Sequence, residues 1–224
     1  MQRHFDEQIQ SLLEKLVLMG RLSESMVQLS LRVLIERNES LSEEVLRKEK
    51  DVNDLQIEID DRAVKLTALQ QPVGSDVRFL FMASRIATEL ERIGDQAVNI
   101  CQNAHHLLKA APLKPLVDLP RMGEIAEGMA RKSIEALVNR DCDLARIVLE
   151  EEKEVDLFRD QIFRVLLTYM MADPRTIERA LALILISRNL ERVGDHATNI
   201  AEEVIYLVEG REVRHRHGIN QVPN

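Results

Sequence analysis

Aromatic residues are scarce in this chain. It has 224 residues and no Trp, and aromatic residues make up only 3% of it. Apolar residues still reach 45%, mainly as Leu, Ile, Val, Ala and Met, so a substantial core can form. This composition, rich also in Glu and Arg, favours packed helices over β-sheets, which are enriched in aromatic and β-branched residues. The length suits one large domain or two of about 100 residues each.

Three further absences limit the class of protein. The net charge of −8 leaves no excess of basic residues, so we expect no nucleic acid as a partner. Cys101 and Cys142 have neither metal-ligand spacing nor a disulfide framework, and we interpret them as buried thiols in a reducing compartment. The N-terminus lacks the apolar run of a signal peptide, and the longest apolar run, 180–186, is too short to span a bilayer. These absences predict a soluble cytoplasmic protein.

The sequence contains an internal repeat. Residues 90–100 read LERIGDQAVNI and residues 190–200 read LERVGDHATNI, with eight of eleven positions identical. Further upstream, identical residues recur at a spacing of 103, from Met19 and Met122 to Val52 and Val155. The second copy has therefore lost three residues between these two regions. We interpret the chain as one duplicated unit, with a first domain over 1–112 and a second over 113–224.

Apolar spacing and proline positions predict six long helices. Steps of three and four separate the apolar residues of the first segment from Phe5 to Val33, which is typical of one helical face. We expect that helix to end near Asn38, and a capping box of Ser40 and Glu43 to start the next. The expected helices are 5–38, 40–71, 75–109, 117–139, 141–172 and 175–209, followed by a basic tail that we interpret as a frayed helix end. The prediction is an all-α fold of two tandem three-helix bundles.

Acidic residues recur on two helices of each half. Folding each hairpin about Pro72 or Pro174 brings the upstream elements, EKDVN at 49–53 and EKEVD at 152–156, level with the repeated motifs. The first acidic cluster is then Glu49, Asn53, Glu91, Asp95 and Asn99. The second acidic cluster is Glu152, Asp156, Glu191, Asp195 and Asn199. Carboxylates four residues apart on a helix repel each other, so a positive ion between them is expected. Sets of oxygen ligands without His or Cys favour hard cations such as Mg²⁺, Ca²⁺, Mn²⁺ or ferric iron.

Ordinary structural roles explain some of the same residues. An acidic pair on a helix is usually a solvated face, and Arg92, Arg192, Lys50 and Lys153 can form simple salt bridges with it. Gly94 and Gly194 lie in helix interiors, where Gly costs about 1 kcal/mol relative to Ala, so we interpret them as sites of close helix packing. We interpret His196 as a surface residue because Gln96 occupies its place in the first half.

The repeated motifs resemble those of the PhoU family of bacterial phosphate-transport accessory regulators. The resemblance covers residues 5–217 and includes LERIGDQAVNI, LERVGDHATNI, EKDVN, EKEVD and the turn segments QQPVGSDVR at 70–78 and TYMMADPRTIER at 168–179. It implies two tandem three-helix bundles, and it implies surface metal clusters, most often of iron, on the acidic motifs. One departure is Asn53, which stands where the family pattern has Asp, so the first cluster has one carboxylate fewer.

The resemblance also implies a function. A member of this family connects the ATPase subunit of a phosphate ABC transporter to a sensor histidine kinase, restrains phosphate uptake and represses the phosphate-starvation response. It implies a homodimer that reaches the membrane only through its partners. The sequence has no glycine-rich phosphate loop and no evident nucleophile with its base, so we expect no enzyme activity. Two alternatives remain from the acidic residues alone: a metal-dependent hydrolase acting on a phosphorylated partner, and a metal-buffering helical protein.

Overall fold

The computed structural model describes residues 2–211, with side chains described from Phe5 onward. It contains the helices α1 (Gln2–Ile35), α2 (Leu41–Gln70), α3 (Ser75–Leu108), α4 (Asp118–Asn139), α5 (Cys142–Ala172) and α6 (Ile177–Glu209), and a 3₁₀ turn, η1 (Pro174–Thr176). No strand occurs in this part of the chain, and the predicted all-α fold is confirmed. The basic tail lies almost entirely outside the described residues. None of the described helices is long and apolar enough to cross a membrane.

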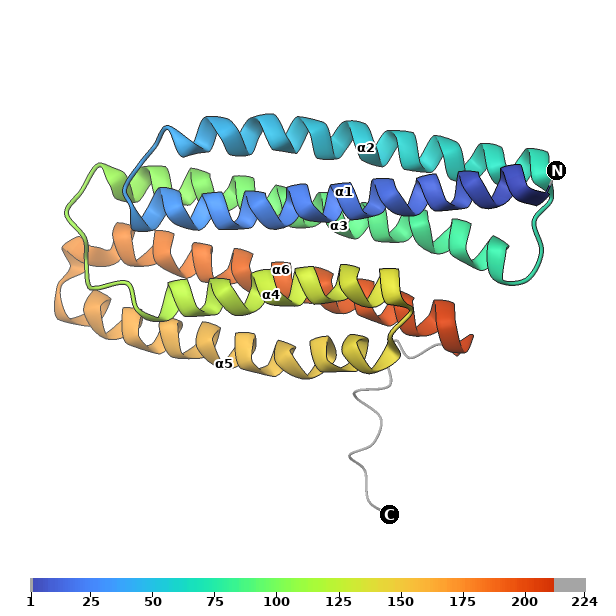
Figure 1. Ribbon diagram of the computed structural model, residues 1–224. Helices are drawn as coiled ribbons and strands as arrows, with labels where there is room; N and C mark the ends of the chain where they lie inside the picture. The colour runs from blue at the N-terminus through green and yellow to red at the C-terminus, as the bar shows by residue number, and fades with distance from the viewer. Residues whose placement is uncertain (1, 212–224) are drawn as a thin grey trace, which may run out of the picture.

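The helices form two three-helix bundles that lie side by side, with α1, α2 and α3 in one and α4, α5 and α6 in the other (Figure 1). α3 and α6 run in opposite directions along the boundary between the bundles, and their contact is the most extensive between any two elements. α1 and α4 also pack against each other. Buried residues of both halves therefore belong to one continuous apolar core. The domain boundary that we expect after Pro112 falls in the connection between α3 and α4.

The predicted apolar faces are the buried faces. On α3, Ile86, Leu90, Ile93 and Ile100 are at most 1% exposed. On α1, Leu12, Leu16, Met19 and Met26 are completely buried, although Leu22 is only partly covered. Burial of a large aliphatic side chain contributes about 1.5–3 kcal/mol, so these regularly spaced faces account for most of the attraction between the helices.

Two equivalent glycines allow α1 and α4 to approach closely. A Cβ atom on Gly20 would lie 2.8 Å from Cγ1 of Ile134, and one on Gly123 would lie 2.2 Å from Cδ1 of Leu31. The spacing of 103 residues relates Gly20 to Gly123 and also Leu31 to Ile134. Each helix therefore places an aliphatic side chain over the glycine of the other, and the contact repeats itself about a local twofold axis.

The helix ends differ in detail from the prediction. α1 ends at Ile35 rather than near Asn38, and the expected capping box is wrong. Ser40 is in the α conformation and makes no side-chain cap; its hydroxyl instead donates to Oδ1 of Asn38 at 2.7 Å. A true side-chain cap occurs at α5, where Asp141 accepts hydrogen bonds from the backbone N–H groups of Asp143 and Leu144. A Ser supplies such a cap only from extended backbone.

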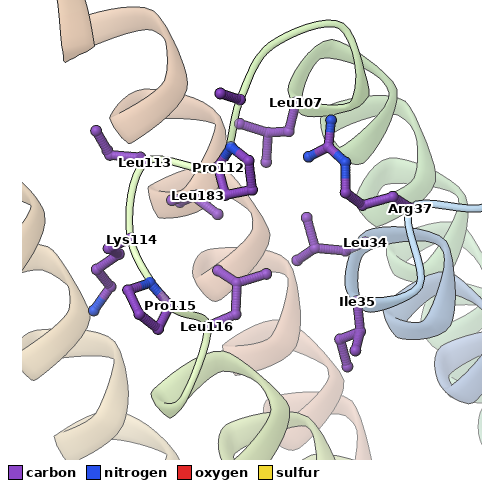
Figure 2. Close-up of a pocket in the computed structure, with 11 residues that line it drawn as sticks. Leu34, Ile35, Arg37, Leu107, Pro112, Leu113, Lys114, Pro115, Leu116 and Leu183 are labelled. Atoms are coloured by element: carbon purple, nitrogen blue, oxygen red, sulfur yellow. The ribbon is translucent and has the colours of Figure 1, made fainter.

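The connection between the halves packs over an apolar pocket. Residues 109–117 pass from α3 to α4 and, with the end of α1 and with Leu183 of α6, line a partly open pocket of about 300 Å³ (Figure 2). Pro112, Pro115 and Leu116 from the connection line this pocket. Arg37, at its edge, donates to the backbone carbonyls of Leu108 and Ala110 at 2.7 and 2.8 Å. The α1–α2 turn and the end of α3 are thereby tied together.

Candidate metal centres

The two hairpins have the register that brings the acidic elements level. In the first hairpin, the Ser84 hydroxyl donates to Asp60, and Nε2 of Gln56 lies 3.5 Å from Oγ1 of Thr88. Continuing one turn along both helices leads to Asn53 on α2 and Glu91 on α3. Both hairpin connections span four residues, 71–74 and 173–176, so the three residues missing from the second copy shorten the helical arms and preserve the register.

Mid-helix glycines lie at the same level as the clusters. A Cβ atom on Gly94 would lie 3.7 Å from Cγ1 of Val52 and 3.2 Å from Cε of Met26, which is tight. A Cβ atom on Gly194 would come no closer than 3.6 Å to Val155 or Met129, which is an ordinary contact. Gly94 is therefore the more closely packed of the two glycines, with the flexible end of Met26 over it, and packing does not require a glycine at position 194.

The first acidic cluster concentrates negative charge, which the nearby Arg92 and His196 only partly offset. All five of its residues are half-buried, beside the core rather than in it. Burial raises the pKa of the Glu91 carboxyl, and the charges of Asp95 and Glu49 raise it further. Nδ2 of Asn53 donates to Oε1 of Glu49 at 3.3 Å. Oδ1 of Asn53 is buried and accepts no hydrogen bond within the described structure. An oxygen without a donor, next to mutually repelling carboxylates, is the environment that a cation would complete.

The second acidic cluster contains a cation of its own. Nη1 of Arg159 on α5 donates to Oδ1 of Asp156 at 3.1 Å and also to Oε1 of Glu191 on α6. Burial raises the pKa of Asp195, and the charges of Glu191 and Asp156 raise it as well, while His196 and, to a smaller extent, Arg159 partly offset them. The pKa of Arg159 is itself raised, first by its hydrogen bond to Asp160 and then by Glu191, against the effect of burial. Glu152 is half-buried on the same helix.

The two asparagines of the predicted clusters are placed differently from the carboxylates. Nδ2 of Asn199 donates to Oε2 of Glu89 on α3 at 3.0 Å, so this side chain reaches towards the other bundle. Asn99 is half-buried, and its backbone carbonyl accepts a hydrogen bond from the Asn103 side chain at 2.7 Å. The structure therefore brings Glu49, Asn53 and Glu91 together and joins Asp156 to Glu191, whereas Asn199 is engaged between the bundles.

His196 is not the surface residue that we expected. Its side chain is only 14% exposed, and Nδ1 lies 2.8 Å from Oε2 of Glu89. Burial alone would raise the pKa of Glu89, but the hydrogen bonds from His196 and Asn199 outweigh it and the pKa is lowered. The sequence-based prediction was wrong because burial of this face depends on α3 of the first half, which no local pattern in α6 reveals.

Sequence reasoning also missed two charged residues beside the clusters. Arg159 is three residues after Asp156 on the same helical face, and this spacing was the available signal. Glu89 is two residues before Glu91 and faces α6, so only the packing of the two halves identifies it. Of the basic residues considered from sequence, Arg92 pairs with Glu89 at 3.5 Å rather than with a predicted ligand.

The donor atoms fit a hard cation, although the side chains are not gathered around one point. Within the described residues, no three His, Cys, Asp or Glu side chains converge closely enough to hold an ion. The orphaned Asn53 oxygen and the raised pKa values of Glu91 and Asp195 nevertheless indicate oxygen donors in need of positive charge. Cys101 is an unsuitable ligand, since burial raises the pKa of its thiol to about 11.

Comparisons with known proteins agree with the repeat. The PhoU domain family model matches residues 16–104 and again residues 119–204. The phosphate-specific transport system accessory protein PhoU homolog of Pseudomonas putida is 36% identical over 214 residues, covering 95% of this chain and 84% of that protein. Its Zymomonas mobilis counterpart is 37% identical over 212 residues, covering 95% and 90%. The crystal structure of PhoU from Pseudomonas aeruginosa has a TM-score of 0.89 at 36% identity, covering 92% of this chain and 100% of that one.

Proposed function

We propose that this chain, which belongs to the PhoU family, is a cytoplasmic accessory regulator of a phosphate ABC transporter. It contacts the transporter's ATPase subunit and a sensor histidine kinase, restrains uptake and represses the starvation response when phosphate is ample. The observation that carries the proposal is the match of both halves to the PhoU domain, over nearly the whole length of proteins named for phosphate transport. An accessory role, without turnover of its own, agrees with those names.

Exposed apolar side chains support a role in binding other proteins. At the tip of the first hairpin, Val64 and Phe81 are 68% and 62% exposed. The equivalent residues of the second hairpin, Leu167 and Leu181, are exposed as well. Groups of exposed apolar residues on helical faces mark protein contacts. A repeated group suits a partner that touches both halves, or a second copy of this chain in a homodimer.

Metal ions at the two acidic clusters are part of the proposal. Each cluster draws ligands from both helices of a hairpin, so a bound Mn²⁺, Mg²⁺, Ca²⁺ or iron ion would hold those helices together. The half-buried ligands would leave coordination positions open to solvent, and phosphate oxygens or a partner's carboxylate are suitable ligands for them. The unpartnered Oδ1 of Asn53 is the specific support for an ion at the first cluster.

The proposal is tested by recovery of partners from cells. A tagged full-length chain, purified from cells grown in ample phosphate, should bring down the ATPase subunit and the sensor kinase, and sedimentation should show its oligomeric state. In a strain lacking the native gene, the same chain should silence a phosphate-starvation reporter. A variant with Val64→Ser and Phe81→Ser should recover less of the partners, while Val138→Ser on α4 is a matched exposed control. Recovery of neither partner, together with an unaffected reporter, would contradict the proposal.

A further inference from the structure

Arg159 joins carboxylates from both helices of the second hairpin. One nitrogen, Nη1, donates to Asp156 on α5 at 3.1 Å and to Glu191 on α6. The other edge of the guanidinium donates to Oδ1 of Asp160, at 3.0 Å from Nε and 2.8 Å from Nη2. Its positive charge thus lies between two predicted ligands of the second acidic cluster. A metal ion bound by both carboxylates would occupy the same place.

The first hairpin has no counterpart of this cation. The spacing that relates Val52 to Val155 places Gln56 at the position of Arg159. Nε2 of Gln56 lies 3.5 Å from the hydroxyl of Thr88, not from a carboxylate. The same spacing places Asn53 at the position of Asp156. The second cluster therefore has one carboxylate more and one cation more than the first, and the two clusters carry the same formal charge.

We infer that Arg159 competes with metal ions for the second acidic cluster and thereby sets its metal affinity. The inference rests on the metal binding in the proposed function. A cation that takes both Asp156 and Glu191 must displace the hydrogen bonds of Nη1, which are strong because donor and acceptor are both charged. The Asp160 contact uses the opposite edge of the guanidinium, so the displaced side chain keeps a partner beside the cluster. At the first cluster, a metal ion would bind without displacing an arginine.

The two clusters can be measured separately in the full-length chain. Glu91→Gln with Asp95→Asn disables the first cluster, and Glu191→Gln with Asp195→Asn disables the second. Binding of Mn²⁺ to each background, followed by electron paramagnetic resonance and by calorimetry, gives one dissociation constant per cluster. The melting temperature of each variant in chelator checks that it is folded.

The decisive variant is Arg159→Gln, which installs the residue of the first hairpin. In the background that retains the second cluster, we expect the Mn²⁺ dissociation constant to fall about tenfold, because the ion no longer breaks charge-assisted hydrogen bonds. Arg164→Gln is the matched control, since it removes the same charge from an exposed position on α5 and should leave the constant unchanged. The reverse substitution, Gln56→Arg, should weaken the first cluster by about the same factor.

An unchanged dissociation constant in Arg159→Gln would overturn the inference and show an ordinary ion pair. Weaker binding would overturn it as well, because Arg159 would then hold the ligands in place for the metal. In both cases wild-type binding remains and the proposed metal sites stand. Absence of Mn²⁺ binding from every folded variant and from the wild type would instead remove the metal sites themselves, and the inference with them.

Discussion

Asn53 and Gln56 of the first hairpin stand where the second hairpin has Asp156 and Arg159. Both hairpins hold carboxylates at the same level on two antiparallel helices. The first leaves an amide oxygen buried without a donor, while the second satisfies its extra carboxylate with a guanidinium. The comparison shows that two copies of one backbone can hold clusters of equal formal charge in which different groups neutralise the carboxylates.

The contact between the bundles shows a similar asymmetry. Glu89 of α3 accepts hydrogen bonds from His196 and Asn199 of α6. The repeat places Asn189 and Gln96 at the positions of Glu89 and His196. Both are buried, and Oε1 of Gln96 has no hydrogen-bond partner in the described part of the chain. On one side of the local twofold axis, the charged Glu89 is hydrogen-bonded to its neighbours. On the other side, the equivalent residues are neutral, and one of their polar atoms lacks a hydrogen-bond partner.

The largest expected effect is loss of metal from one half at a time. Glu91→Ala with Asp95→Ala should remove the ions of the first half only, and Glu191→Ala with Asp195→Ala those of the second. Each should also lose about 2.7 kcal/mol of metal-dependent stabilisation at a free cation concentration about a hundred times the dissociation constant. Elemental analysis and thermal unfolding with and without Mn²⁺ measure both. Full metal content in either variant would show that its cluster is not a site.

Removal of the charged link between the bundles should come next. Glu89→Ala leaves His196 and Asn199 without their shared acceptor in a largely covered place, which should cost about 2 kcal/mol of unfolding free energy. The pKa of Glu89 is lowered in the folded protein, so its contribution is present above the unfolded pKa and lost as pH falls through the folded pKa. Urea unfolding at several pH values measures this. Asn189→Ala is the matched control, and an equal or larger loss there would contradict the asymmetry.

A smaller difference is expected at the α1–α4 contact. Gly123→Ala should cost about 1 kcal/mol, because overpacking against Leu31 exceeds the gain in helix propensity. Gly20→Ala should cost less, since the distance to Ile134 is greater, but it should still destabilise because Cγ1 of this β-branched residue would be only 2.8 Å away. Denaturant unfolding of a double-mutant cycle with Leu31→Val tests the cause: shortening this side chain should cost less in the Gly123→Ala background than in the wild type. If the two substitutions had additive effects on stability, overpacking against Leu31 would not be the cause of the loss in Gly123→Ala.

The smallest expected effect distinguishes the two clusters by pH. In chelator near neutral pH, Glu91→Gln should stabilise the protein by about 0.5 kcal/mol, because it removes repulsion within an i, i+4 acidic pair. The pKa of Glu91 is raised in the fold, so the wild type gains stability as pH falls through the folded pKa and the difference shrinks. Asp195→Asn should gain less because Arg159 already pairs with Glu191, the carboxylate four residues before Asp195, and because His196 also offsets the repulsion. Thermal unfolding from neutral to mildly acidic pH would show an equal gain if Arg159 has no influence.

Local patterns predicted much of the fold and part of the candidate sites. The six helices follow from helical periodicity, and the level of Asn53 with Glu91 follows from the fixed rise per residue. The repeat and the PhoU resemblance follow from identical residues and motifs in the sequence. The capping box at Ser40 failed because capping depends on backbone angles that residue type alone does not set. Metal occupancy of the clusters, the partners and the homodimer remain predictions.

The sequence by itself determined which residues share a helical face and which carboxylates meet within a hairpin, because both depend only on short-range geometry along one chain segment. Only the tertiary structure decided that α3 meets α6, that Glu89 finds His196, and that Arg159 rather than Arg192 enters the second cluster. Those contacts depend on how whole faces of distant helices pack against one another. No local periodicity encodes that choice, since many faces are apolar enough to be buried and side-chain shape selects among them.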